Sequence, residues 1–345
     1  MPGLINRNNN MDAVRYYLAT SVLIAHFNFM GGHDIPWPTS SHTAVGGFFA
    51  LSGFLVYGSY LRNPSLINFI KRRARRILPP YVFIVLLCTF GLSGATTLST
   101  SEYFASADWW KYLFANLFFL NFLQSTLPGV FESSEYAVHA VNGSLWTMKV
   151  EWMLYLSVPI VAWLHTRLNW RRLPTLLGML AFSIGYRILF YYMYADTGNE
   201  LYNILSRQVF GQLSYFYVGV IIYFYLDQFM KWKWQIIAIA TAITLLSPHI
   251  PFYNQWLDPL VSGSAVIWFS MVGNWGKWMS GRNNVSYDIY LFHFPVIQLS
   301  IFTGINALPS WQALAIVMTA TIALANLSWH CIGKHFMKHT HKQYR

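Results

Sequence analysis

The feature that most constrains this chain is a series of apolar runs, each close to the length of a membrane-spanning helix. A helix needs about 20 apolar residues to cross the hydrocarbon core of a bilayer. Only 10% of the 345 residues are charged, too few to build a water-facing surface. The sequence therefore predicts an all-α polytopic integral membrane protein, with a single transmembrane domain over residues 1–345 and no appended soluble domain. The expected spans are about 12–30, 44–60, 78–98, 145–164, 173–194, 208–226, 234–248, 257–273, 286–303 and 311–332.

The basic residues predict which ends of these spans face the cytoplasm. Of the 23 lysines and arginines, 18 fall on one alternating set of connections, whereas the other set holds only Lys111 and Arg207. Cytoplasmic loops carry the excess of Lys and Arg, so the pattern predicts ten crossings with both termini in the cytoplasm. It places segment 99–144 outside, where the aromatic run 109–123 either lies along the interface or re-enters the membrane. No cleavable signal peptide is expected before the first span.

Composition and motifs exclude several other classes of protein. The net charge of +11 is accounted for by the distribution of basic residues between loops, so nucleic acid is not an expected partner. Cys88 and Cys331 both lie in apolar runs, which argues against a disulfide framework. The chain has no HExxH, CxxC or Gly-rich phosphate loop, and we expect no metal centre and no nucleotide hydrolase.

Charged and titratable side chains inside the spans are the candidate functional residues, because such groups are costly in a bilayer. Arg15 and His26 are 11 residues apart, about three helical turns, so they share one face of the first span about 16 Å apart. Glu151 in the fourth span lies at a depth close to that of His26, as a His–Glu pair requires. The alternatives are that Arg15 reaches lipid headgroups and that His26 only joins two helices by a hydrogen bond.

Arginines before the third span suggest where an anionic ligand could enter. Arg73 and Arg76 belong to the basic run 71–76, which also fits a simple topology anchor. A cationic entrance on the cytoplasmic side, followed by an imidazole further along a helix face, suits a donor with phosphates and a long neutral arm. Acyl-coenzyme A has that shape.

Four further polar residues have open roles. Ser52, in the segment of small residues 46–54, fits close helix packing as well as hydrogen-bond donation. Lys149 fits an internal ion pair, and Arg187 fits a counter-ion of Glu151. His293 fits packing or hydrogen bonding better than catalysis.

Five segments in order along the chain resemble the acyltransferase family 3 membrane proteins, which O-acylate bacterial surface polysaccharides. Arg15-x10-His26 is similar to the family's Arg/Lys-x10-His signature. The other four are GGFFALSGFLV (46–56), KRRARRILPPY (71–81), GSLWTMKVEWMLYL (143–156) and SYDIYLFHFPV (286–296).

This resemblance implies an O-acetyltransferase of the bacterial cytoplasmic (inner) membrane, with acetyl-CoA as donor. The acceptor would be an extracytoplasmic carbohydrate such as O-antigen, exopolysaccharide or a polyprenyl-linked glycan. His26 would be the general base or the acyl carrier, and Glu151 would orient it. The donor would be bound by Arg15, Arg73 and Arg76, and the expected oxyanion or supporting groups are Ser52, Lys149 and Arg187.

The chain also departs from the family pattern. Trp152 stands where many members have a second acidic residue, and Lys149 stands where serine is common. The esterase-like C-terminal domain of some members is absent from this sequence. We therefore expect either direct transfer to the acceptor or a separate periplasmic transferase as partner.

Two other functions remain open on the residues alone. A proton-coupled transporter or flippase of a glycan would use intramembrane His, Glu and Arg as a proton relay, although the paired broken helices typical of such proteins are not visible. A non-catalytic scaffold for glycan assembly would not need Arg15 and His26 on one face.

Overall fold

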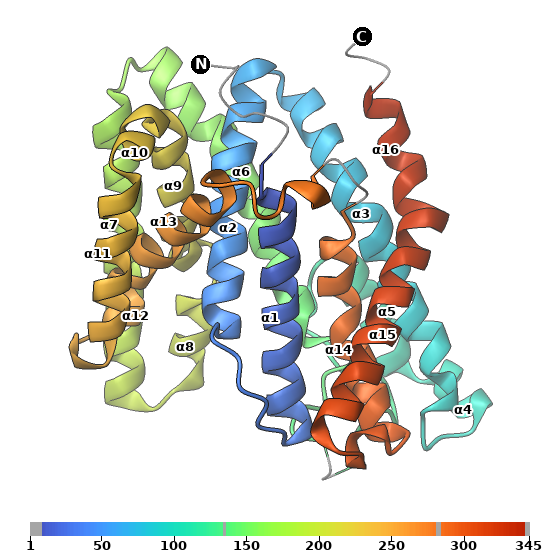
Figure 1. Cartoon of the computed structure of the whole chain (residues 1–345). Helices are drawn as coiled ribbons and strands as arrows, with labels where there is room; N and C mark the ends of the chain where they lie inside the picture. Colours follow the sequence, from blue (N-terminus) through green and yellow to red (C-terminus); the bar gives the residue numbers. More distant parts are fainter. Residues whose placement is uncertain (1–8, 134–135, 281–283, 342–345) are drawn as a thin grey trace. The chain divides into compact units, whose positions relative to one another are not determined.

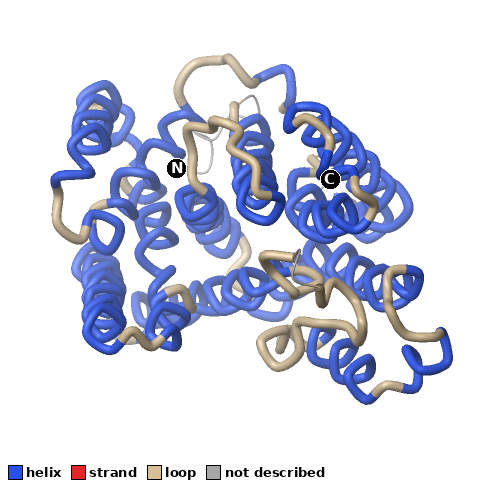
Figure 2. The backbone as a smooth tube through the Cα atoms, turned by 90° about the horizontal axis from the view of Figure 1, so that it is seen from below, coloured by secondary structure: helices blue, strands red, loops and turns tan. Residues whose placement is uncertain are grey.

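The computed structural model describes residues 9–133, 136–280 and 284–341, and these residues are predominantly helical (Figure 1). Among them the backbone tube contains helices and loops (Figure 2), with one isolated antiparallel bridge between Thr96 and Val130. The all-α prediction is confirmed.

A helix lies at each of the ten predicted spans. Nine begin and end within a few residues of the prediction. The bounds are α1 (Met11–Gly31), α2 (Ser41–Arg62), α3 (Leu66–Gly91), α6 (Trp146–Arg167), α7 (Arg172–Thr197), α9 (Val209–Phe224), α11 (Lys233–Leu246), α13 (Asp258–Met271), α14 (Ser286–Phe302) and α15 (Ser310–Ser328). The shorter helices are α4 (Thr100–Ala105), α5 (Ala107–Leu117), α8 (Glu200–Ser206), α10 (Leu226–Lys231), α12 (Tyr253–Trp256) and α16 (Lys334–His341).

The exception is α3, which begins 12 residues before the predicted start at 78. Its first turns contain the basic run 71–76, so Arg73 and Arg76 lie on the helix itself and not in the loop before it. Lysine and arginine are good helix formers, which is why the helix continues through a segment too polar to be counted in an apolar run.

Length limits which of these helices can cross a membrane. Among the described residues, four helices are long and apolar enough: 41–62, 66–94, 172–197 and 310–337. Helices α11 and α13 have 14 residues each, about 21 Å at 1.5 Å per residue, less than a typical hydrocarbon core. Helix α5, within the aromatic run 109–123, has 11 residues and is too short to cross. The ten crossings and the cytoplasmic termini remain predictions.

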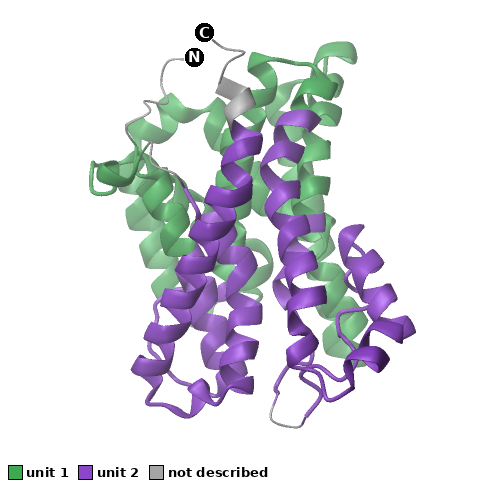
Figure 3. Cartoon of the chain, turned by 90° about the vertical axis from the view of Figure 1, so that its right-hand side faces the viewer, with its two compact units in different colours: residues 1–18, 42–69, 150–282 green, residues 19–41, 70–149, 283–345 purple. Residues whose placement is uncertain are grey.

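The chain divides into two compact units, each assembled from separate stretches of sequence (Figure 3). The first unit contains residues 1–18, 42–69 and 150–282, and the second contains residues 19–41, 70–149 and 283–345. The prediction of one transmembrane domain is not tested by this division.

In the first unit, α2 and α9 approach each other closely. A Cβ atom on Gly53 would overlap the carbonyl group of Phe216, and one on Gly219 would overlap the carbonyl oxygen of Ala50. Two glycines facing two backbones allow this approach, as in other helix pairs joined through small residues. Packing was one of the two predicted uses of segment 46–54, and Gly53 serves it.

In the second unit, α14 packs against α15 and against the C-terminal half of α1. Buried apolar side chains fill the space between these helices; they include Leu23, Phe27, Phe294, Ile297, Leu314 and Val317. His26 follows Leu23 by three residues and precedes Phe27, so this core holds the histidine against α14.

Candidate functional site

His26 forms a hydrogen bond with His293 across α1 and α14. The Nδ1 atom of His26 lies 2.8 Å from the Nε2 atom of His293, and the two rings are within 5° of parallel. Phe294 packs edge-on against His26 with ring centroids 5.4 Å apart. His293 is completely buried, whereas His26 is partly exposed.

The backbone of α14 decides which nitrogens of this pair carry protons. The Nδ1 atom of His293 lies 2.7 Å from the carbonyl oxygen of Tyr290. Because a carbonyl oxygen can only accept, this Nδ1 carries a hydrogen and the Nε2 of neutral His293 is an acceptor. His26 must then donate through its own Nδ1, which leaves its Nε2 with a lone pair. The pair therefore presents the tautomer that a general base or a nucleophile requires.

Residues 142–147, before and at the start of α6, form hydrogen bonds with the part of α14 that carries His293. Asn142 donates to the carbonyl oxygen of Leu291 at 2.9 Å, and the hydroxyl groups of Thr147 and Tyr290 are 2.9 Å apart. Two of the segments that suggested the family, 143–156 and 286–296, thus meet beside the histidine pair.

Glu151, the predicted partner of His26, accepts a hydrogen bond from Tyr155 one turn further along α6. Glu151 belongs to the first unit and His26 to the second. Their pairing therefore stays a prediction.

The predicted donor-binding arginines occupy two helices. Arg15 lies on α1, the same uninterrupted helix as His26, and forms an ion pair with Asp12 at 3.2 Å. Arg73 is half-buried and Arg76 exposed on α3. Arg76 is close enough to Asp288 to act on it electrostatically. No described contact tests phosphate binding by these arginines.

The three residues proposed for oxyanion support lie in different surroundings. The Lys149 ammonium lies 4.6 Å from the ring centroid of Phe122. Ser52 is half-buried on α2. Arg187 is buried, and its guanidinium donates to the carbonyl oxygens of Gly211, Asn254 and Gln255. The role of Arg187 as a counter-ion of Glu151 stays a prediction.

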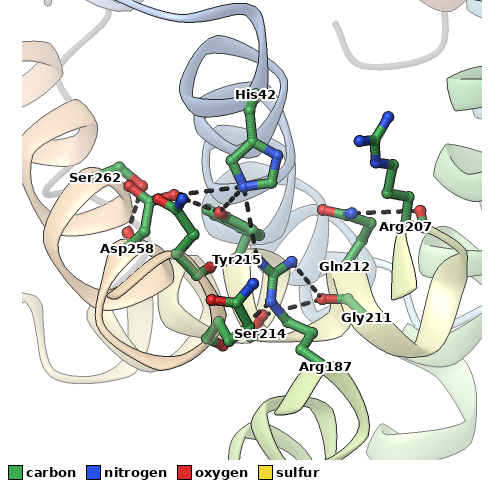
Figure 4. Close-up of polar contacts among 11 residues, drawn as sticks. His42, Arg187, Arg207, Gly211, Gln212, Ser214, Tyr215, Asp258 and Ser262 are labelled. Atoms are coloured by element: carbon green, nitrogen blue, oxygen red, sulfur yellow. Dashed lines mark hydrogen bonds and ion pairs between the residues drawn. The ribbon is translucent and has the colours of Figure 1, made fainter. Parts of the chain in front are cut away.

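A second polar cluster, which the sequence analysis missed, surrounds Arg187 in the first unit (Figure 4). Tyr215 donates to the carboxylate of Asp258, and His42 Nε2 lies 2.9 Å from the Tyr215 hydroxyl. The sequence carried two signals for this cluster, Arg187 and an acidic residue at 258, each within a predicted span. The histidine at 42 lies just before the predicted start of its span and gave no signal.

The aromatic residues of α5 divide into buried and exposed sets. Trp109 is buried and donates to the carbonyl oxygen of Thr89 at 3.1 Å, and Tyr112 is also buried. Trp110 remains 49% exposed and Phe114 52% exposed. Only the exposed set is available to stack on an acceptor.

The histidines, cysteines and carboxylates of the described chain form no group of three or more suited to a metal ion. The imidazoles of the histidine pair can support proton transfer or covalent attack.

Comparison with known proteins bears directly on this chemistry. A family model described as an acyltransferase domain matches residues 8–330. The chain is similar to the O-acetyl transferase of Shigella phage Sf6, with 26% identity over 96% of this chain and 97% of that protein. It is 26% identical to nodulation protein 10 of Rhizobium leguminosarum bv. viciae, over 96% of this chain and 93% of that protein. It is 23% identical to the O-acetyltransferase OatA of Staphylococcus aureus, over 83% of this chain and 50% of that protein. No solved structure matches the chain.

Proposed function

The chain belongs to the acyltransferase 3 family, and its relatives from phage Sf6 and Staphylococcus aureus are named O-acetyltransferases; we propose that it transfers acetyl from acetyl-CoA to a glycan hydroxyl. The donor would bind from the cytoplasm and the acceptor from the other side of a bacterial cytoplasmic membrane, which the chain would cross several times. The observation that carries this conclusion is the chain of hydrogen bonds from His26 through His293 to the Tyr290 carbonyl oxygen.

In the proposed reaction, His26 acts as general base. Its Nε2 lone pair accepts the proton of the sugar hydroxyl as the oxygen attacks the thioester carbonyl carbon. The tetrahedral intermediate collapses with cleavage of the carbon–sulfur bond, and the protonated imidazole returns its proton to the departing thiolate. The products are the acetyl ester and coenzyme A. A positioned base contributes about 10²–10⁴-fold in rate.

The same lone pair also suits covalent transfer. In that route Nε2 attacks the thioester carbon, coenzyme A leaves, and the acetyl-imidazole is then attacked by the sugar hydroxyl. Both routes need His26 with hydrogen on Nδ1 and none on Nε2, which is the tautomer favoured by His293.

The remaining assignments follow from charge. Glu151 would stabilise the imidazolium form of His26. Arg73 and Arg76, with Arg15, would hold the phosphates of the donor by charge-assisted hydrogen bonds. The developing oxyanion would accept hydrogen bonds from Ser52, Lys149 or Arg187.

The experiment measures transfer from labelled acetyl-CoA to de-O-acetylated surface polysaccharide, using the full chain in nanodiscs. We expect His26→Ala to lower the rate by at least 100-fold. His293→Phe removes the acceptor for His26 Nδ1 and should cost about tenfold, the value of one hydrogen bond. His293→Gln offers an amide oxygen in its place and should recover most of that loss. His330→Ala, at an exposed histidine of the turn after α15, is the matched control.

Retention of near-normal transfer by a folded His26→Ala protein would refute the role of His26. Movement of glycan across vesicle membranes without any gain of acetyl would favour the transporter alternative. Equal losses in His293→Phe and His293→Gln would show that the tautomer is not the property that matters.

A further inference from the structure

The polar cluster around Arg187 is built on buried charges but ends in a partly exposed imidazole. Tyr215 is fully buried and Asp258 nearly so, whereas 40% of the His42 side chain is exposed. These residues come from α2, α9 and α13, with Arg187 from α7, all within the first unit. Burying a carboxylate and a guanidinium is costly unless both are hydrogen-bonded, and here both are.

The hydrogen bonds of the cluster fix the orientation of His42. Tyr215 gives its only hydroxyl hydrogen to Asp258, so the phenolic oxygen accepts from the Nε2–H of His42 at 2.9 Å. The longer contact of this nitrogen with Arg187 Nη2, at 3.5 Å, then joins two donors and is not a hydrogen bond. His42 then has hydrogen on Nε2 and a lone pair on Nδ1. In Figure 4 the second ring nitrogen of His42 points away from the drawn hydrogen bonds.

The lone pair on His42 Nδ1 favours a ligand that carries a hydroxyl hydrogen. The Asp258 carboxylate lies 3.7 Å from His42 Nε2, and the Arg187 guanidinium lies 3.5 Å from the same atom. The guanidinium of Arg187 gives three of its five hydrogens to backbone carbonyl oxygens, one each from Nε, Nη1 and Nη2. Arg207 is a second cation beside the cluster (Figure 4). The neutral imidazole itself offers a hydrogen-bond acceptor, which a ligand hydroxyl can fill and a fully ionised phosphate cannot.

Aromatic side chains lie on and next to α12, the short helix whose carbonyl oxygens accept hydrogen bonds from Arg187. Helix α12 supplies the carbonyl oxygens of Asn254 and Gln255, and it also carries Trp256, which is 38% exposed. Phe252, which precedes α12, is 37% exposed and packs against Tyr192 with ring centroids 5.0 Å apart. A few oriented polar groups beside aromatic surfaces are typical of sites for small neutral molecules.

We propose that His42, oriented by Tyr215 and Asp258, is a subsite that accepts a hydrogen bond from a hydroxyl of the carbohydrate acceptor. Its assignment to the acceptor rests on the proposed function. By the predicted sidedness, the first residues of α2 and α13 face outside the cytoplasm, where the acceptor would be. His42 is a binding residue in this scheme, separate from the chemistry assigned to His26.

The test separates acceptor binding from donor binding and from chemistry. Transfer is measured in nanodiscs with labelled acetyl-CoA and de-O-acetylated surface polysaccharide, varying each in turn. We expect His42→Phe to raise the KM for polysaccharide about 5–10-fold, the loss of one hydrogen bond, with the KM for acetyl-CoA unchanged. His42→Gln retains a donor toward Tyr215 and an acceptor, and should recover most of the affinity.

Tyr215→Phe should give a smaller increase in the same KM, because it removes the group that orients His42. Tyr217→Phe is the matched control on the same helix, since the Tyr217 hydroxyl contacts Ser157 and lies outside the cluster. An unchanged polysaccharide KM in His42→Phe would overturn the subsite. So would a fall in thermal stability with equal changes in both KM values, which would indicate a purely structural role.

A direct binding measurement keeps this inference distinct from the proposed function. Polysaccharide affinity is measured on the His26→Ala protein with and without His42→Phe. Weaker binding in the double variant supports the subsite even if no acetyl transfer is ever detected. Equal binding overturns the subsite even if transfer by the unmodified protein is robust.

Discussion

Replacing Gly53 by alanine tests the closest helix contact in the first unit. The new Cβ would lie 2.8 Å from the carbonyl carbon of Phe216 and 3.2 Å from its Cα, and closer still to its oxygen. Ordinary carbon–carbon contacts are about 3.5–4.0 Å, so α2 and α9 would have to separate by about 1 Å. The obstacle is backbone, which cannot rotate away as a side chain can.

The magnitude follows from two opposing effects. Overpacking of this kind costs typically about 1–3 kcal/mol, and we expect the upper value because two helices must move. Alanine recovers about 1 kcal/mol through its higher helix propensity. The net result should be a loss of about 2 kcal/mol, seen as a lower midpoint of thermal unfolding in detergent.

Gly185→Ala is the matched control, because a Cβ at Gly185 in α7 meets no atom within 4 Å. It should raise stability by about 0.5–1 kcal/mol. The two variants thus have opposite predicted signs. If Gly53→Ala is as stable as Gly185→Ala, α2 and α9 do not approach as described.

The remaining predictions concern the donor arginines and one helix cap. Charge reversal at Arg73 and Arg76 should weaken acetyl-CoA binding, measured in nanodiscs. The effect should be larger than that of charge reversal at the exposed Arg62 at the end of α2. Equal affinities in the two variants would indicate that the basic run 71–76 only anchors the topology. Hydrogen bonds from Ser99 lower the pKa of Glu102. The ionised carboxylate therefore stabilises α4 fully when the pH is above the ordinary glutamate pKa, and this stabilisation is lost as the pH falls through the lowered pKa. Amide-exchange protection across α4 should therefore drop below about pH 4, whereas Glu102→Gln should show no such pH dependence; a drop of the same size in both would exclude the carboxylate.

The helices could be predicted because the length and hydropathy of each apolar run indicate a span independently of the rest of the chain. The start of α3 was wrong by 12 residues, because hydropathy alone cannot distinguish a charged helical turn from a loop. His26 became a candidate because of its spacing to Arg15, which is a property of one helix.

The partners of these residues were harder to predict, because they depend on contacts between distant segments. His293 was expected to form hydrogen bonds rather than to catalyse, and the structure shows its hydrogen bonds. Nothing in the sequence indicated that one partner would be His26. The cluster of His42, Tyr215 and Asp258 joins three helices whose packing no local pattern encodes.

The hydrogen bond from His293 to the Tyr290 carbonyl oxygen has a consequence for the path of the proton. A carbonyl oxygen holds a hydrogen bond but does not take up a proton near neutral pH, so the chain of imidazoles ends there. In the proposed reaction, a proton gained by His26 would therefore have no exit through the Tyr290 carbonyl oxygen. It would leave by the nitrogen through which it arrived, and the departing sulfur would receive it.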